Sequence, residues 1–150
     1  MKATGASDPA RLPHLLLDTH VLVWLMFGEA KLGTKAARTI NLSARGNRLL
    51  VSAITPWEIG VLVAKRRIEL HQDTMQWVRT ATSLPGMQLA PLEPEIAIES
   101  TCLPFEMHAD PADRILVATA RRLGATLVTA DRALLDLAGS GRFRAIDASL

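Results

Sequence analysis

Short apolar runs alternate with longer amphipathic stretches along this chain. The runs have the length and continuity of strands buried in a parallel sheet. They cover residues 14–17, 49–51, 87–92, 125–128 and 143–146. Strands that alternate with helices predict an α/β fold, a three-layer sandwich in which helices flank a central, mostly parallel sheet.

Start and stop signals place the helices between these runs. The predicted helices span about 21–28, 35–44, 55–66, 73–84, 94–103, 110–123 and 131–137. Two helix starts, Thr55 to Glu58 and Asp110 to Asp113, have the spacing of a capping box. In that motif the side chain of the first residue and an acid three positions later bond to each other's backbone N–H groups.

The composition fits one globular domain. With 150 residues, 49% of them hydrophobic and 21% charged, we expect a single domain over 1–150 in which residues 1–12 form a flexible tail. The longest apolar stretch, 15–27, is interrupted by Asp18 and His20 and is too short to span a bilayer. We therefore expect no membrane segment and, because no signal-peptide pattern is present, a cytoplasmic protein.

Four acidic residues share one local setting. Each follows a short apolar run and stands at the start of a helix-like stretch: Asp18, Glu58, Asp113 and Asp131. If the runs are parallel strands, their carboxyl ends share one edge of the sheet, where open α/β folds bind ligands. Carboxylates held that close have raised pKa values or are neutralised by a hard divalent cation. The pattern therefore predicts a Mg²⁺ or Mn²⁺ site.

Helix capping is the alternative explanation for most of these acids. Asp110 fits an N-cap, Asp113 and Glu58 fit the third positions of capping boxes, and Asp131 fits a favourable charge in a first helical turn. Capping does not explain why so many strand ends carry an acid, nor why Asp18 ends a buried strand. A joint site is the better interpretation.

Other polar residues leave more than one reading open. Thr19 and Thr129 are candidates to hydrogen-bond a carboxylate or a metal-bound water, although capping explains them nearly as well. The four histidines lack the paired spacing of a zinc site, so no role is assigned to them. With a formal net charge of +2, overall charge does not indicate nucleic-acid binding. Basic residues near the acids, which either track phosphates or solvate helix ends, are Lys65, Arg66, Arg114 and Arg132.

Three segments together resemble a known family. They are LLLDTHVLVWL from Leu15, SAITPWEIGVLVAKRRIEL from Ser52, and HADPADRILVATARRLGATLVTADRAL from His108. In this order they resemble the PIN-domain ribonucleases, and among them the VapC-type toxins of bacterial toxin–antitoxin pairs. The third segment is similar to the subgroup with an H-x-D-P-x-D-R element, except that Ala112 stands where an aromatic residue is usual.

The resemblance implies a function and a division of roles. Asp18, Glu58, Asp113 and Asp131 would bind Mg²⁺ or Mn²⁺ and be catalytic, with Asp110 as an accessory acid. The activity would be endonucleolytic cleavage of RNA by a metal-activated water. The implied partners are a cognate antitoxin and a second copy of the chain.

Two alternatives belong to other functional classes. A receiver-like signalling domain also gathers acids and Mg²⁺ at strand ends, but it needs a lysine after a late strand, where this chain has Asp131 and Asp147. A catalytically silent RNA-binding module would keep the fold and lose an acid, yet all four acids are present. The sequence gives no indication of the RNA target.

Overall fold

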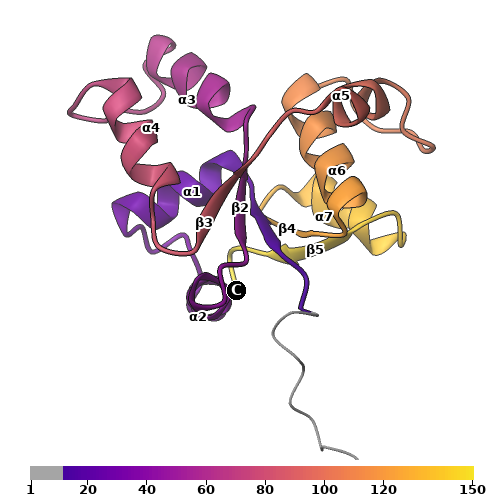
Figure 1. Cartoon of the computed structure of the whole chain (residues 1–150), viewed down its shortest axis with the longest axis horizontal. Helices are drawn as coiled ribbons and strands as arrows, with labels where there is room; N and C mark the ends of the chain where they lie inside the picture. The colour runs from indigo at the N-terminus through magenta and orange to yellow at the C-terminus, as the bar shows by residue number, and fades with distance from the viewer. Residues whose placement is uncertain (1–11) are drawn as a thin grey trace, which may run out of the picture.

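A sheet of five parallel strands forms the centre of the molecule (Figure 1). The computed structural model describes residues 12–150, so the tail predicted at 1–12 lies outside the described residues except for its last position. The strands are β1 (Leu15–Leu17), β2 (Leu49–Ser52), β3 (Met87–Ala90), β4 (Thr126–Thr129) and β5 (Arg144–Asp147).

Helices occupy the predicted connections, with small differences at their ends. They are α1 (Thr19–Phe27), α2 (Thr34–Arg45), α3 (Thr55–Ala64), α4 (Thr74–Thr82), α5 (Pro94–Thr101), α6 (Pro111–Leu123) and α7 (Arg132–Gly139). The helix predicted to reach residue 66 ends at Ala64, because Arg66 has a φ of 55° and leaves the helical region. Within residues 12–150 no helix is long and apolar enough to cross a membrane.

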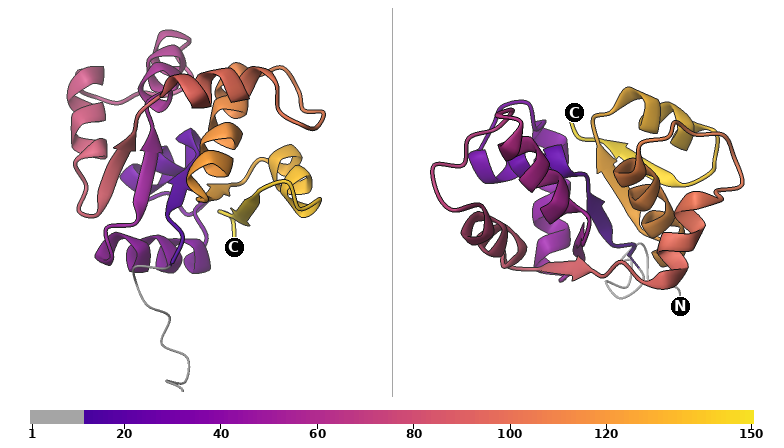
Figure 2. Two further views of the ribbon diagram at one scale, coloured as in Figure 1. Left: turned by 45° about the vertical axis from the view of Figure 1, so that its right-hand side comes forward. Right: turned by 90° about the horizontal axis from the view of Figure 1, so that it is seen from above.

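Helices cover both faces of the sheet, which confirms the predicted three-layer sandwich (Figure 2). Leu15 and Leu17 of β1 pack on one face with residues of α1 to α4, whereas Leu16 packs on the other face with residues of α5 to α7. β1 is therefore buried on both sides, which is why its sequence is a continuous apolar run rather than an alternating one.

Gly86 shows how closely the helical layer approaches the sheet. Its φ is 81°, and a Cβ atom at this position would overlap the backbone carbonyl of Ala44 in α2. Glycine is therefore required in the turn before β3, on both conformational and steric grounds. The carbonyl of Gly86 accepts a hydrogen bond from the N–H of Leu49, which starts the pairing of β2 with β3.

The strand order is β3-β2-β1-β4-β5. The chain winds in one direction from β1 to β3 and in the other through β4 and β5, so the order reverses between β1 and β4. Open α/β sheets bind ligands at such a switch point, outside the carboxyl ends of the strands. Receiver-like domains have the order β2-β1-β3-β4-β5 instead. The topology therefore excludes the receiver-like alternative.

Candidate functional site

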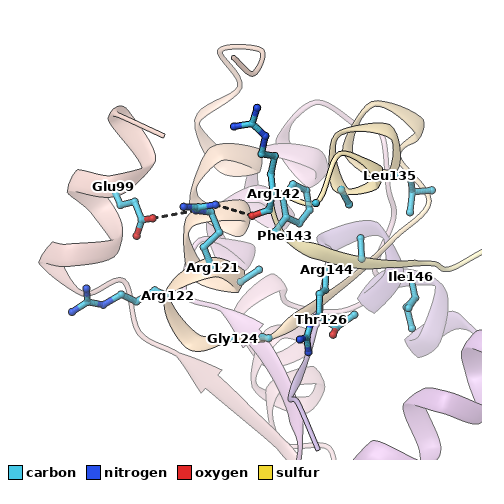
Figure 3. A pocket seen from close by; sticks show the side chains of 16 residues that line it. Glu99, Arg121, Arg122, Gly124, Thr126, Leu135, Arg142, Phe143, Arg144 and Ile146 are labelled. Atoms are coloured by element: carbon cyan, nitrogen blue, oxygen red, sulfur yellow. Dashed lines mark hydrogen bonds and ion pairs between the residues drawn. The ribbon is translucent and has the colours of Figure 1, made fainter. Parts of the chain in front are cut away.

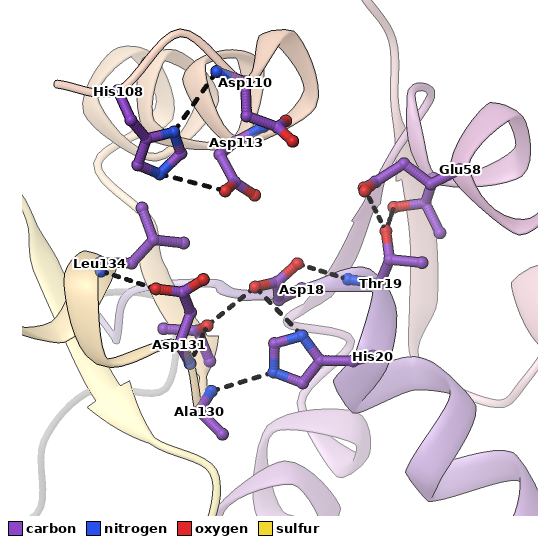
Figure 4. A network of polar contacts seen from close by, with 12 residues as sticks. Asp18, Thr19, His20, Glu58, His108, Asp110, Asp113, Ala130, Asp131 and Leu134 are labelled. Carbon is purple, nitrogen blue, oxygen red and sulfur yellow. Dashed lines mark hydrogen bonds and ion pairs between the residues drawn. The ribbon is translucent and has the colours of Figure 1, made fainter. Parts of the chain in front are cut away.

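The four singled-out acids meet around the switch point (Figure 4). Asp18 directly follows β1, and Asp131 follows β4 by two residues. Glu58 lies in the first turn of α3, and Asp113 lies in the first turn of α6. Their mutual proximity is evident at Asp113, whose pKa is raised first by burial and then by the negative charges of nearby acids, which include the other three.

Asp18 is buried and held by donors on both oxygens. Its exposed fraction is 4%. Oδ1 accepts a hydrogen bond from the Thr19 N–H at 2.7 Å, and Oδ2 accepts one from the Thr129 hydroxyl at 2.8 Å. Burial raises the pKa of Asp18, while His20, Thr129 and Thr19 oppose that rise. The position of this carboxylate is therefore fixed by the protein itself.

The capping box predicted at the start of α3 is wrong. The N-cap is Ile54, it makes no side-chain capping bond, and Thr55 is already the first helical residue. The Glu58 carboxylate instead accepts a hydrogen bond from the Thr19 hydroxyl at 2.5 Å, and the hydroxyls of Thr19 and Thr55 lie 3.1 Å apart. Burial raises the pKa of Glu58, Thr19 lowers it, and Asp18 adds to the rise. Glu58 therefore points to the acid cluster rather than to its own helix start.

The start of α6 makes only half of its predicted capping box. Asp110 is the N-cap, and its Oδ1 accepts a hydrogen bond from the Asp113 N–H at 3.0 Å. No reciprocal bond from the Asp113 carboxylate to the Asp110 N–H is present. Burial, followed by the charges of Asp18, Asp110, Asp131 and Glu58, raises the pKa of Asp113 to about 7. The pKa of Asp113 therefore shows the repulsion within the acid cluster most clearly.

Thr129 and Asp131 close the cluster from the β4 side. Thr129 is fully buried at the end of β4, and its hydroxyl both donates to Asp18 Oδ2 and accepts from the Asp131 N–H at 3.0 Å. Asp131 is the N-cap of α7, where its Oδ1 accepts from the Leu134 N–H at 3.1 Å. The predicted polar roles of Thr19 and Thr129 are therefore hydrogen bonds to the acids or their backbone.

Two histidines that the sequence reasoning left without a role face the acids. His20 Nε2 accepts a hydrogen bond from the Ala130 N–H at 3.0 Å, which places its proton on Nδ1, 3.4 Å from Asp18 Oδ2. His108 Nδ1 accepts from a backbone N–H at the start of α6, which places its proton on Nε2, 3.3 Å from Asp113 Oδ2. In sequence, each histidine lies two residues from an acid of the site, and that spacing was the available signal.

The carboxylates suit a hard divalent cation, although their side chains are not arranged as a complete coordination shell. Within residues 12–150 no three His, Cys, Asp or Glu side chains form a ready metal-binding group. Mg²⁺ keeps several of its waters and needs only one or two protein carboxylates, so a tight cage is not required. An edge of repelling carboxylates, with the pKa values of Asp18, Glu58 and Asp113 all raised, is an environment that a cation stabilises.

The basic residues predicted to contact RNA fall in different places. Lys65 and Arg66 lie beyond the end of α3. Arg114 donates from its guanidinium to the carbonyls of Ser100, Met107 and His108, so it holds the loop between α5 and α6. Arg132 lies 3.5 Å from Asp147, with its side chain 72% exposed.

Comparison with known proteins finds relatives over most of the chain. A family model described as the PIN domain matches residues 15–140. The curated ribonuclease VapC22 of Mycobacterium tuberculosis (strain ATCC 25618 / H37Rv) is 32% identical over 120 residues, which are 80% of this chain and 88% of the relative.

Solved structures show the same fold. VapBC2 from Rickettsia felis, bound to a DNA fragment from its promoter, matches with a TM-score of 0.66 at 15% identity, over 89% of this chain and 97% of that one. DNA-bound VapBC from Salmonella typhimurium matches with a TM-score of 0.66 at 18% identity, over 91% of this chain and 98% of that one. At these identities the likeness concerns the fold.

Proposed function

This chain belongs to the PIN-domain family, and from that premise we propose that it is a metal-dependent endoribonuclease that serves as the toxin of a toxin–antitoxin pair. The relationship to ribonuclease VapC22 supports the activity. Ribonucleases of this type are metal-dependent in general, and we assign the metal as Mg²⁺ or Mn²⁺ because the four converging acids offer the hard carboxylate oxygens that these ions prefer.

The observation that carries the proposal is the gathering of acids from four segments at the switch point. The pKa of Asp113, raised to about 7 by burial and by the surrounding acids, expresses that gathering as an electrostatic cost. Strongly raised pKa values of this kind cluster at functional sites, and a cation that binds there would remove the cost.

The protein's own residues would divide the work in the following way. Asp18, Glu58, Asp113 and Asp131 would hold the cation, which when bound supplies Lewis-acid assistance to phosphodiester hydrolysis. Thr19 and Thr129 keep the Asp18 and Glu58 carboxylates in one orientation through their hydroxyls and the Thr19 N–H. Asp110, as the N-cap, fixes the first turn of α6 that carries Asp113.

The proposal extends to partners and cellular setting. A structure with the same fold, from Klebsiella pneumoniae, is described as a toxin–antitoxin complex, and this supports an antitoxin as partner of this chain. A basic side chain from that partner, placed among the acids, would compete with the cation. We further propose a single nuclease domain, a homodimer, and action in the cytoplasm, where RNA is available.

The test is to incubate the purified protein with cellular RNA and to map the ends of the fragments. We expect discrete new ends with Mg²⁺ or Mn²⁺ and none in EDTA, and comparison of the two ions assigns the metal. Equal cleavage in EDTA would contradict a metal-dependent enzyme. RNA binding without cleavage under every metal condition would instead favour the catalytically silent RNA-binding module.

A further inference from the structure

A cavity rich in arginine lies at the opposite end of β4 and β5 from the acids. Its volume is about 1300 Å³, and we call it the arginine cavity after four of its lining residues. They are Arg121, Arg122, Arg142 and Arg144 (Figure 3). Glu99 is the single lining carboxylate, which leaves a surplus of three positive charges. Such a surplus in a concave surface favours an anionic ligand.

Two of the arginines are held in place by the protein. Arg121 donates from Nε to Glu99 at 3.3 Å and from its terminal nitrogen to the Arg142 carbonyl at 2.7 Å. The guanidinium groups of Arg121 and Arg142 lie 5.3 and 5.5 Å from the centre of the Phe105 ring. Phe105 is thus already covered by cations, and it orders them rather than offering a free face to a base.

The other two arginines differ in their charge environment. Within residues 12–150 no acidic side chain forms an ion pair with Arg122 or Arg144, and both are exposed. Arg122 lies in the last turn of α6, where the helix dipole favours a positive charge. Arg144 begins β5, so the same explanation does not apply to it.

The arginine cavity is connected to the acids by a series of contacts along the loop 102–110. Phe105, which touches Arg121 and Arg142, also lines a second cavity of about 540 Å³ together with His108. His108 in turn lies 3.3 Å from the carboxylate of Asp113. A ligand that extends from Asp113 past this loop would therefore reach Arg121 and Arg142, and with them the arginine cavity.

We propose that the arginine cavity binds the phosphate backbone of the RNA strand that extends from the acids along the loop 102–110. This inference rests on the proposed ribonuclease function. The guanidinium groups are spread across the surface in Figure 3 instead of converging on one point, which suits successive phosphates better than a single anion. Contacts to phosphates carry no base information, so binding here depends strongly on salt and weakly on sequence.

The test compares two double variants in a catalytically silenced Asp113→Asn background. Arg122→Gln with Arg144→Gln removes the two cations that have no ion-pair partner in the described range 12–150, and Arg38→Gln with Arg79→Gln makes the same charge change at exposed sites on α2 and α4. Fluorescence anisotropy with a labelled single strand of about 16 nucleotides, the upper end of common single-strand sites, measures binding at several salt concentrations. The cavity variant should bind about tenfold more weakly than the control, and its salt slope should fall by about 1.4 for two lost phosphate contacts.

Cleavage assays of the two double variants, with Asp113 intact, test the cavity proposal separately from the proposed ribonuclease function. On a substrate of about four nucleotides, the lower end of common single-strand sites, the cavity variant should differ less from the control than it does on the strand of about 16 nucleotides. If affinity and salt slope match the control while RNA is still cut, the cavity proposal is overturned and the ribonuclease remains. If the cavity variant loses binding to the antitoxin and keeps RNA affinity, the cavity is a protein-binding surface and the proposal is likewise overturned. If the unmodified protein neither binds nor cuts RNA, both proposals fall.

Discussion

The two sides of the acid cluster are built differently. On the side of α1 and α3, Asp18 and Glu58 accept hydrogen bonds from the hydroxyls of Thr129 and Thr19. On the side of α6, the Asp113 carboxylate accepts no hydrogen bond within residues 12–150, and the basic side chain that faces it is His108, whose Nε2 lies 3.3 Å from Oδ2. The fold therefore fixes the first side by hydrogen bonds, whereas the charge of Asp113 has no such support and would be neutralised by the proposed cation. This difference predicts which changes affect position, which affect charge, and how large each effect is.

The largest effect should follow removal of a ligand charge on either side. We expect Asp18→Asn and Asp113→Asn each to lower kcat/KM by more than about 100-fold. That is the largest loss usual for mutation of a residue that only orients a metal ligand through a hydrogen bond. The amide keeps the shape of the side chain and removes its charge. RNA cleavage under saturating Mg²⁺ or Mn²⁺ measures the loss.

Asp136→Asn is the matched control, because Asp136 is an exposed acid on α7 that makes no ion pair within residues 12–150. It should cut RNA like the unmodified protein. Normal activity in either ligand variant would remove that acid from the site and break the comparison between the two sides.

An intermediate effect should follow loss of a hydroxyl on the fixed side. Thr129→Val removes the hydrogen bond to Asp18 Oδ2 and the acceptor for the Asp131 N–H. We expect a loss of roughly 10–100-fold in kcat/KM and in metal affinity, as for other residues that orient a ligand. Thr119→Val is the control, since this equally buried hydroxyl bonds only to the Ile115 carbonyl within α6. Equal effects from the two variants in both measurements would mean that Thr129 serves stability alone.

The same difference between the two sides explains what the sequence could predict. The strands, the α/β class and the edge shared by the acids follow from apolar runs and from the rule for parallel sheets. The N-cap role of Asp110 was also predictable, because capping is local. Thr55 and Glu58 have nearly the same spacing and residue types as Asp110 and Asp113. Their side chains nevertheless face Thr19, which is far away in the sequence.

Residues distant in sequence decided the other features that sequence reasoning missed. The capping box fails at Glu58 because a hydroxyl on α1 offers its half-buried carboxylate a better partner than its own helix start. The contacts of His20 and His108 depend on backbone N–H groups that point at their rings, and one sequence gives no such orientation. The arginine cavity joins α6 to β5, and its arginines do not form a continuous basic run in the sequence.

The smallest effect, and the one that separates the two sides most directly, is on the stability of the metal-free protein. The pKa of Asp113 is raised from its ordinary 3.8 to about 7, so between these values the folded state holds a proton that the unfolded state has lost. The contribution of Asp113 to the free energy of unfolding is therefore complete below pH 3.8 and is lost as the pH rises through about 7. Asp18 and Glu58, whose pKa values are also raised, act in the same direction.

Thermal melts in EDTA across this range should therefore show the melting temperature of the unmodified protein falling as the pH rises. Asp113→Asn cannot ionise, so its curve should be flatter, and near neutral pH it should melt about 3 °C higher, the shift that ~1 kcal/mol produces in a chain of this size. Asp18→Asn should gain less, because Asp18 already has donors that favour its charged form. Saturating Mg²⁺ or Mn²⁺ should raise the melting point of the unmodified protein and reduce its dependence on pH, since a cation that binds only the native state stabilises it and replaces the bound proton. An equal gain for Asp113→Asn and Asp18→Asn would show that the repulsion is shared evenly and that the two sides do not differ as their hydrogen bonds indicate. A melting temperature that neither ion changes would contradict a cation site at the acids.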